Sequence, residues 1–208
     1  MQPRPVHVLV FDSLADWEIG HTLAFLHSGQ FQPGPPRYRV CAVGRSRAPV
    51  TTQGGLTIVP EVTLSELRPG DSALLLLPGG AAWDRGELDD VARLAREWAA
   101  AGVPVAAICG ATAGLARVGL LDDRAHTSNA REYLAATGYA GGDHYRDAPA
   151  VTDRGVITAN TTAPVDLARH VFAALGLFSE EVLAAWYGLF RTGEPHHYAA
   201  LMRAASGG

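Results

Sequence analysis

The sequence predicts an α/β fold in which a mostly parallel β-sheet is covered by helices on both faces. Short apolar runs of strand length alternate along the chain with segments whose apolar residues recur at helical spacing. The run at 73–77 contains four consecutive leucines, which is typical of a strand that is buried on both faces. With 208 residues, of which 48% are apolar and 18% charged, the chain is large enough to bury a full core without disulfides.

The first half of the chain begins with an apolar run at 6–11, which predicts a strand, and continues with a helical pattern at 17–26. Residues 38–43 predict a second strand. A pair of glycines in the middle of 50–59 predicts a hairpin, because glycine adopts the backbone conformations of tight turns at low cost. The leucine strand that comes next ends at the Pro-Gly-Gly sequence 78–80.

The second half of the chain repeats the alternation of strands and helices. Residues 103–108 predict a strand, and an Asp-Arg-Gly turn predicts a second hairpin over 150–159. Pro164 occupies the favoured first position of a helix. The predicted helices cover about 87–101, the segment that begins at Gly110, 164–175, 179–191 and 196–204.

Composition limits the architecture and the partners. No linker or repeat divides the sequence, so we expect one domain over 1–208, with a core at about 6–177 and extra C-terminal helices at about 179–204. Two cysteines at unrelated positions form no disulfide or zinc pattern, which fits a reducing compartment. Without a bilayer-spanning run or a signal-peptide core, we expect a cytoplasmic protein with no membrane partner. A net charge of −4 without a basic block argues against a nucleic-acid partner.

Cys109 is the strongest candidate for a catalytic residue, because it lies where the strand 103–108 changes directly into a helix. A thiol on such a turn is presented at the carboxyl edge of the sheet, next to free N–H groups at a helix N-terminus. These groups favour the thiolate, so we predict a pKa below the usual value of about 8.5. The alternative for any free cysteine is a small apolar core residue, which is the prediction for Cys41 inside its strand-like run.

Three glycines follow strands that end at the same edge as Cys109. Gly79 and Gly80 come directly after the leucine strand, and Gly110 comes after Cys109. One backbone N–H from Gly79 or Gly80 and one from Gly110 could form an oxyanion hole, whereas the alternative for the glycine pair is a simple tight turn. Trp83 could line the same pocket as an aromatic wall or pack in the core.

Two acidic residues lie at the start of the first predicted helix. Asp16 is explained as a helix cap or a partner of the helix dipole. Glu18 lies further inside an apolar segment, so its carboxyl must be paired or protonated if it faces the edge of the sheet. We therefore predict that Glu18 shares a proton with the thiol of Cys109.

The residue Glu18 and the motifs LPGG at 77–80, AICG at 107–110, VITAN at 156–160 and APVDLA at 163–168 resemble the ThiJ/PfpI family of the class I glutamine amidotransferase-like superfamily. The resemblance extends over about 6–177. It implies a flavodoxin-like three-layer sandwich, a reactive Cys109 in contact with the Glu18 carboxyl, and a homodimer. Members are described as glyoxalases or deglycases, peptidases, isonitrile hydratases, chaperones and stress proteins, so the resemblance does not fix a substrate.

The chain departs from several branches of this superfamily. The peptidase branch has a histidine directly after the nucleophile, where this chain has Gly110, and glutamine amidotransferases have a His-x-Glu pair where this chain has ANTT at 159–162. Peptidase and glutaminase activity are therefore not expected. The deglycase branch has a histidine after the elbow helix, and His126 is the nearest match. The register leaves open whether His126, Ser128 or Asn129 faces the pocket.

Two C-terminal patterns bear on partners and cofactors. The apolar segment 182–190 follows a sheet that already has its helices, so we expect part of it to be buried in a homodimer interface. His196 and His197 lack a third ligand at useful spacing, so we predict no metal site, and we expect no other cofactor.

Two functions remain open from the sequence. In the first, a small-molecule hydrolase or lyase, Cys109 attacks an electrophilic carbon and Glu18, with His126 as a possible pocket base, moves the proton. In the second, a stress-response or redox-sensing protein, Cys109 is oxidised to a sulfinate that Glu18 holds by a hydrogen bond.

Overall fold

The computed structural model describes residues 2–206. The strands are β1 (Arg4–Leu9), β2 (Tyr38–Gly44), β3 (Val50–Thr51), β4 (Thr57–Ile58), β5 (Val62–Thr63), β6 (Leu74–Leu77), β7 (Val105–Ile108), β8 (Ala150–Asp153) and β9 (Val156–Ala159). The helices are α1 (Asp16–Ser28), α2 (Ala81–Asp84), α3 (Asp89–Ala100), α4 (Gly110–Arg117), α5 (Arg131–Ala135), α6 (Pro164–Ala174), α7 (Glu180–Thr192) and α8 (Pro195–Ser206). Short 3₁₀ helices cover Leu64–Glu66, Pro69–Asp71 and Gly142–His144.

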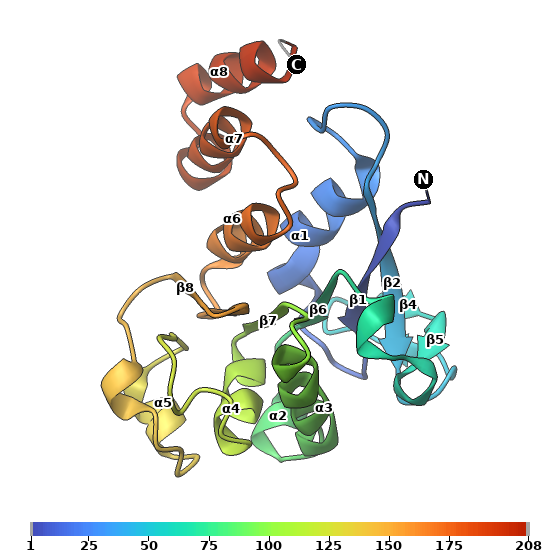
Figure 1. Cartoon of the computed structure of the whole chain (residues 1–208), viewed down its shortest axis with the longest axis vertical. Coiled ribbons are helices and arrows are strands. Elements are labelled where there is room, and N and C mark those ends of the chain that lie inside the picture. The colour runs from blue at the N-terminus through green and yellow to red at the C-terminus, as the bar shows by residue number, and fades with distance from the viewer. Residues whose placement is uncertain (1, 207–208) are drawn as a thin grey trace.

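The main sheet has seven strands in the order β5-β2-β1-β6-β7-β9-β8. All neighbours are parallel except β8, which pairs antiparallel with β9. The strands β3 and β4 form the predicted hairpin beside the sheet. Figure 1 shows helices on both sides of the sheet, which confirms the predicted flavodoxin-like α/β sandwich.

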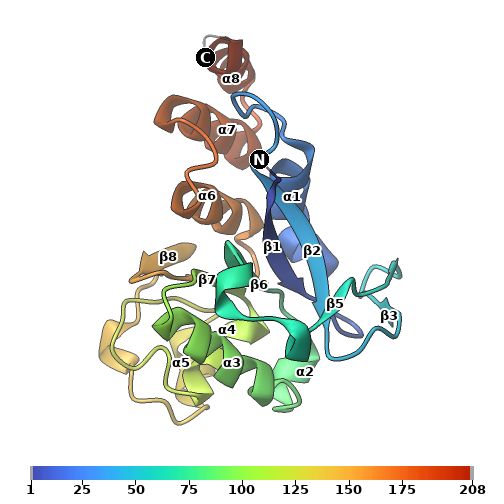
Figure 2. The ribbon, with the colours of Figure 1, turned by 45° about the vertical axis from the view of Figure 1, so that its right-hand side comes forward.

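Two hydrophobic cores lie on the two faces of the sheet. One core packs the sheet against α1, α6, α7 and α8, and the other packs it against α2, α3, α4 and α5, as the two groups of helices in Figure 2 illustrate. The four leucines of β6 are all completely buried, and they alternate between the cores because successive strand residues point to opposite faces. This explains why the strand shows no polar residue in the sequence.

The predicted strands and helices are present, with ends that shift by a few residues. The helix α2, the helix α5 and the strand β5 were not predicted. They have four, five and two residues, and such short elements carry too little periodicity to be recognised.

The apolar segment 182–190 lies entirely in α7 and packs mainly within the chain. The side chains of Val182, Ala185 and Trp186 are buried, and the Trp186 ring contacts the rings of Phe25 and Phe172 edge-on. Phe190, at 37% exposed, remains at the surface. Most of the burial of this segment is therefore provided by its own chain. This contradicts the reason for expecting a dimer, which was that the segment needs a partner. The homodimer itself stays a prediction.

No helix within residues 2–206 has both the length and the apolar character needed to cross a bilayer.

Candidate active site

Cys109 lies on a strained turn between β7 and α4. Its φ of 56° and ψ of −125° fall in a region that residues other than glycine rarely adopt, and such a conformation costs about 1–3 kcal/mol. Backbone bonds hold the turn in place: the Cys109 N–H donates to the carbonyl of Ala159 (3.1 Å), and the Cys109 carbonyl accepts from the N–H (3.1 Å) and the hydroxyl (2.6 Å) of Thr112. The sharp turn leaves the thiol partly exposed.

The structure brings Glu18 of α1 to this thiol. The Glu18 side chain is almost completely buried, with only 1% of the residue exposed, and its carboxyl lies beside the side chain of Cys109. Its Oε2 accepts the Gly79 N–H (2.9 Å), and its Oε1 accepts the hydroxyl of Thr161 (2.9 Å). Burial raises the pKa of the Glu18 carboxyl, and the hydrogen bonds from Thr161 and Gly79 oppose this effect.

The oxyanion hole predicted from the glycines needs a correction at Gly79. Its N–H already donates to Glu18, so it is not free for a substrate. A Cβ on Gly79 would lie 2.4 Å from Oε2 of Glu18 and 2.8 Å from the Cβ of Cys109, so glycine is needed here for close approach. The N–H groups of Gly80 and Gly110 have no acceptor within residues 2–206 and remain available.

Asn129 supplies the side chain that contacts the sulfur from the opposite loop. Its Nδ2 donates to the Sγ of Cys109 (3.4 Å), and its Oδ1 accepts the N–H of Thr161 (2.9 Å). Of the three residues that the sequence left open, Asn129 is the one that the structure places at the thiol. Thr161 was not predicted, although its position just after β9 could have indicated it, because β9 ends at the same edge of the sheet as β7.

His126 does not serve the thiol in this structure. It is completely buried; its Nδ1 contacts the carbonyl of Arg124 (2.8 Å) and its Nε2 contacts the hydroxyl of Tyr139 (3.0 Å). Both ring nitrogens are therefore occupied, and the assignment of His126 as a pocket base is not supported. Ser128 is also buried, with its hydroxyl against that of Thr112 (2.6 Å).

The expected lowering of the Cys109 pKa is wrong in direction. Burial is the largest influence, and it raises the pKa of the Cys109 thiol above its usual value. The amide of Asn129 and the hydroxyl of Thr161 act in the opposite direction, while the charge of Glu18 adds to the increase. The thiol at this helix N-terminus is thus less acidic than its position in the sequence suggested.

Trp83 is a supporting residue beneath the turn and not a wall of the pocket. It is completely buried, and its Nε1 donates to the carbonyl of Pro78 (2.8 Å). A Cβ on Gly114 would lie 2.4 Å from the ring, and the ring of Phe11 packs edge-on against it. Trp83 therefore fixes the segment that carries Gly79 and Gly80 against α4.

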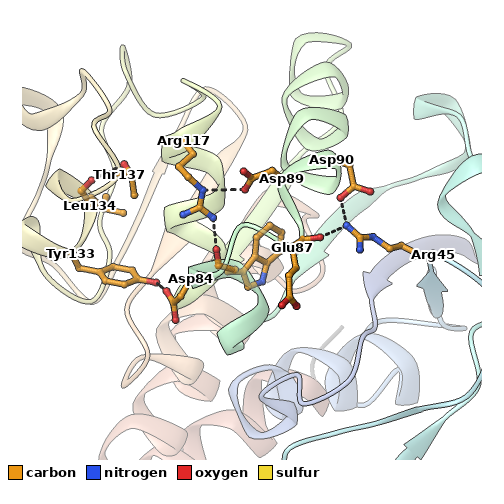
Figure 3. A network of polar contacts seen from close by, with 10 residues as sticks. Arg45, Asp84, Glu87, Asp89, Asp90, Arg117, Tyr133, Leu134 and Thr137 are labelled. Atoms are coloured by element: carbon orange, nitrogen blue, oxygen red, sulfur yellow. Dashed lines mark hydrogen bonds and ion pairs between the residues drawn. The ribbon is translucent and has the colours of Figure 1, made fainter.

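Polar contacts hold α2 beside the active site from both sides. Figure 3 shows the hydroxyl of Tyr133 in α5 pointing to the carboxylate of Asp84 in α2, to which it donates a hydrogen bond. Arg117 of α4 donates to Asp89 at the start of α3 (3.0 Å), as Figure 3 also shows. Arg117 also donates to the carbonyl of Trp83. Burial and Asp84 raise the pKa of Tyr133, and the proximity of Cys109 adds to this increase.

Asp16 is not the cap of α1, because Ala15 is the N-cap, but it lies in the first turn of α1, where the alternative of a helix-dipole partner puts it. The Asp16 carboxylate accepts the hydroxyl of Thr52 (2.6 Å), so it connects the start of α1 to the β3–β4 hairpin.

At the surface, the carboxylate of Glu194 lies beside His196 and His197, with candidate ligand atoms of the three within 4.8 Å of one another. The stated reason against a metal, the lack of a third ligand, is therefore wrong. Glu194 already pairs with His196 (3.2 Å).

Comparisons with known proteins identify the family of the chain. Residues 4–174 match the family model described as DJ-1/PfpI family. The chain is 37% identical over 205 residues to a Bacillus subtilis protein named uncharacterized protease YoaZ, covering 97% of this chain and 98% of that protein. A second B. subtilis protein, uncharacterized protease YdeA, is 27% identical over 90% of this chain and 91% of its own length.

Solved structures give the same result. A ThiJ/PfpI family protein from Bacillus anthracis superposes with a TM-score of 0.89 at 35% identity, covering 98% of both chains. A DJ-1 superfamily protein from Agrobacterium tumefaciens superposes with a TM-score of 0.80 at 33% identity, covering 91% of this chain and 99% of its own. With the family model matched over most of its length and a turn that carries Cys109 against Glu18, this chain belongs to the DJ-1/PfpI family.

Proposed function

We propose that the protein is a cysteine-dependent hydrolase or lyase that acts on a small electrophilic molecule, with Cys109 as the nucleophile. The observation that carries the proposal is the position of the buried carboxyl of Glu18 beside the partly exposed thiol of Cys109. A nucleophile paired with a proton acceptor on a strained strand-to-helix turn is the arrangement used in covalent catalysis. Family membership and the relatives named proteases support a hydrolase.

The residues at the turn have different roles in the proposed reaction. The thiol proton passes to the carboxylate of Glu18 while the sulfur bonds to the electrophilic carbon, and the displaced π electrons move to the neighbouring oxygen or nitrogen. The free N–H groups of Gly80 and Gly110 are the donors available to that anion. Glu18 then returns the proton to the adduct. Burial raises the pKa of Glu18, which makes its carboxylate a better proton acceptor than an exposed one.

The substrate is proposed to be small and not a peptide. Cleavage of a peptide bond needs an acid that protonates the leaving amine, which histidine provides in cysteine and serine peptidases. The ring nitrogens of His126 are bonded to Arg124 and Tyr139, and Gly110 follows the nucleophile. Addition of the thiol to a dicarbonyl or an isonitrile releases no amine, so this step needs no second acid to protonate a leaving group.

The alternative function is a stress-response or redox-sensing protein with an oxidisable Cys109. The groups around the sulfur support this function as well, because the oxygens of a Cys109 sulfinate would accept hydrogen bonds from the Asn129 amide and from a protonated Glu18.

Intact-mass analysis together with product analysis separates the two functions. The wild-type protein and the variants Cys109→Ala and Cys41→Ala are exposed in turn to dicarbonyls, isonitriles, glutamine and dilute peroxide. We expect catalytic conversion of a dicarbonyl or an isonitrile by the wild type and by Cys41→Ala, none by Cys109→Ala, and no conversion of glutamine. If peroxide adds two oxygen atoms at Cys109 and no electrophile is turned over, the redox function replaces the hydrolase or lyase.

A further inference from the structure

The side chain of Asn129 is a neutral group that donates a hydrogen bond to the reacting sulfur. Its Nδ2 lies 3.4 Å from the Sγ of Cys109, within the distance of a hydrogen bond to sulfur, and Asn129 is an exposed residue. Glu18 approaches the same sulfur from α1, on another part of the chain. The thiol is therefore held between an acid and an amide.

Thr161 fixes which end of the amide faces the sulfur. Its backbone N–H lies 2.9 Å from the Oδ1 of Asn129, and a backbone N–H can only donate. The oxygen of the amide must therefore face Thr161, which leaves the NH₂ group for Cys109. The hydroxyl of Thr161 donates to Oε1 of Glu18 (2.9 Å), so one residue orients both groups that contact the thiol.

An amide differs from a histidine in what it can do for a thiol. It donates a hydrogen bond, but it does not take up a proton at physiological pH. Its effect is therefore to stabilise the sulfur after the proton has left, while Glu18 remains the acceptor of that proton. Burial and the charge of Glu18 both raise the pKa of Cys109, so the thiolate needs such a donor.

We infer that Asn129 is a catalytic residue whose amide holds the Cys109 thiolate, and that Thr161 is the positioning residue that keeps the amide in the donating orientation. The use of this thiolate in turnover rests on the proposed function. In the step itself, the S–H bond breaks, the proton goes to a carboxylate oxygen of Glu18, and the electron pair stays on the sulfur, where the N–H of Asn129 donates to it.

The test is the pH dependence of iodoacetamide alkylation at Cys109, followed by intact mass in a Cys41→Ala background. Asn129→Ala removes the donor and should raise the thiol pKa by about one unit, which lowers the alkylation rate at pH 7 about tenfold. Asn129→Asp keeps the shape and the acceptor for Thr161 but puts a carboxylate oxygen against the sulfur, so it should raise the pKa further.

Asn160→Ala is the matched control. Asn160 is a loop asparagine close to Thr161 in sequence, and its Oδ1 accepts from the N–H (3.0 Å) and the hydroxyl (2.8 Å) of Thr162 instead. It should leave the thiol pKa unchanged. Circular dichroism of each variant checks that the fold is kept. If Asn129→Ala unfolds, Asn129→Asp, which has nearly the same shape as the wild type, still provides a folded variant for the comparison.

Alkylation profiles of Asn129→Ala and Asn129→Asp that coincide with the parent would overturn the inference. A shifted profile without any turnover by the wild type would instead leave intact the stabilisation of the thiolate by Asn129, and would remove its use in catalysis together with the proposed function. The two failures are therefore distinguishable.

Discussion

Cys41 and Cys109 belong to two strands of one sheet, β2 and the end of β7, that are separated by β1 and β6, and the surroundings of the two thiols differ. Cys41 lies inside β2, beside His7 of β1, and only 1% of it is exposed. Cys109 lies one residue beyond β7, on a strained turn, and is partly exposed. Burial raises the pKa of both thiols. The pKa alone therefore does not distinguish a core cysteine from a nucleophile here.

The groups around each sulfur make the difference. Near Cys41, Arg39 and Glu61 form an ion pair whose side chains are 44% and 52% exposed, so water screens much of their effect. Near Cys109, the buried carboxyl of Glu18 and the oriented amide of Asn129 act directly on the thiol. What distinguishes the nucleophile is thus the exposure of its thiol to solvent and the polar side chains that point at its sulfur.

The largest expected effect is in alkylation of the folded protein. Cys109 should react at least about a hundredfold faster than Cys41, because Cys41 reacts only after local opening and each 1.4 kcal/mol of opening free energy slows it about tenfold. Under native conditions, intact mass should show one adduct on the wild type and on Cys41→Ala, and none on Cys109→Ala. Two adducts formed at equal rates on the native wild type would show that the contrast between the thiols is false.

A smaller effect concerns the backbone at the two positions. At 109 the positive φ favours glycine, so Cys109→Gly should be about 1 kcal/mol more stable than Cys109→Ala. At 41, inside a regular strand, the order should reverse, with Cys41→Ala more stable than Cys41→Gly by about 0.5–1 kcal/mol. Urea unfolding of the four variants measures both differences. The same order at both positions would argue against strain at the turn.

The smallest expected effect is the pH dependence of stability due to Glu18. Because burial raises its pKa in the folded protein, the unfolded chain loses the proton first as pH rises. The free energy of unfolding should therefore fall between the usual pKa of glutamic acid and the raised pKa of Glu18, and level off above it. Glu18→Gln should remove this slope, whereas Glu61→Gln, at the exposed carboxylate near Cys41, should keep it. Urea titrations from pH 4 to 8 measure the slope, and an unchanged slope in Glu18→Gln would contradict the assignment.

The sequence predicted the sheet well because its strands are short, apolar and bounded by recognisable turns. The four leucines of β6 and the Asp-Arg-Gly turn between β8 and β9 are of this kind. The rule that carboxyl ends of parallel strands share one edge also placed Glu18, Gly80 and Cys109 together.

The parts of the site that escaped prediction lie where no regular element sets the register. His126 and Asn129 are only three residues apart in a segment with a single isolated bridge, from His126 to Tyr145, so sequence spacing did not decide which one reaches the thiol. The choice between the N–H groups of Gly79 and Gly80 stayed open because the sequence does not show that Glu18 would accept the N–H of Gly79. The direction of the Trp83 ring depends on the space above Gly114, which only packing reveals.

The hydrogen bond between Thr161 and Glu18 joins residues 143 positions apart. During synthesis the N-terminal part of the chain, including Cys109, is complete long before the segment after β9 leaves the ribosome, and contacts between distant segments form late. Until then the sulfur has neither its oriented amide nor its fixed carboxyl. In an unfinished chain, Cys109 therefore lacks the groups that accept its proton and stabilise its thiolate. These groups reach the sulfur only when the last strand has joined the sheet.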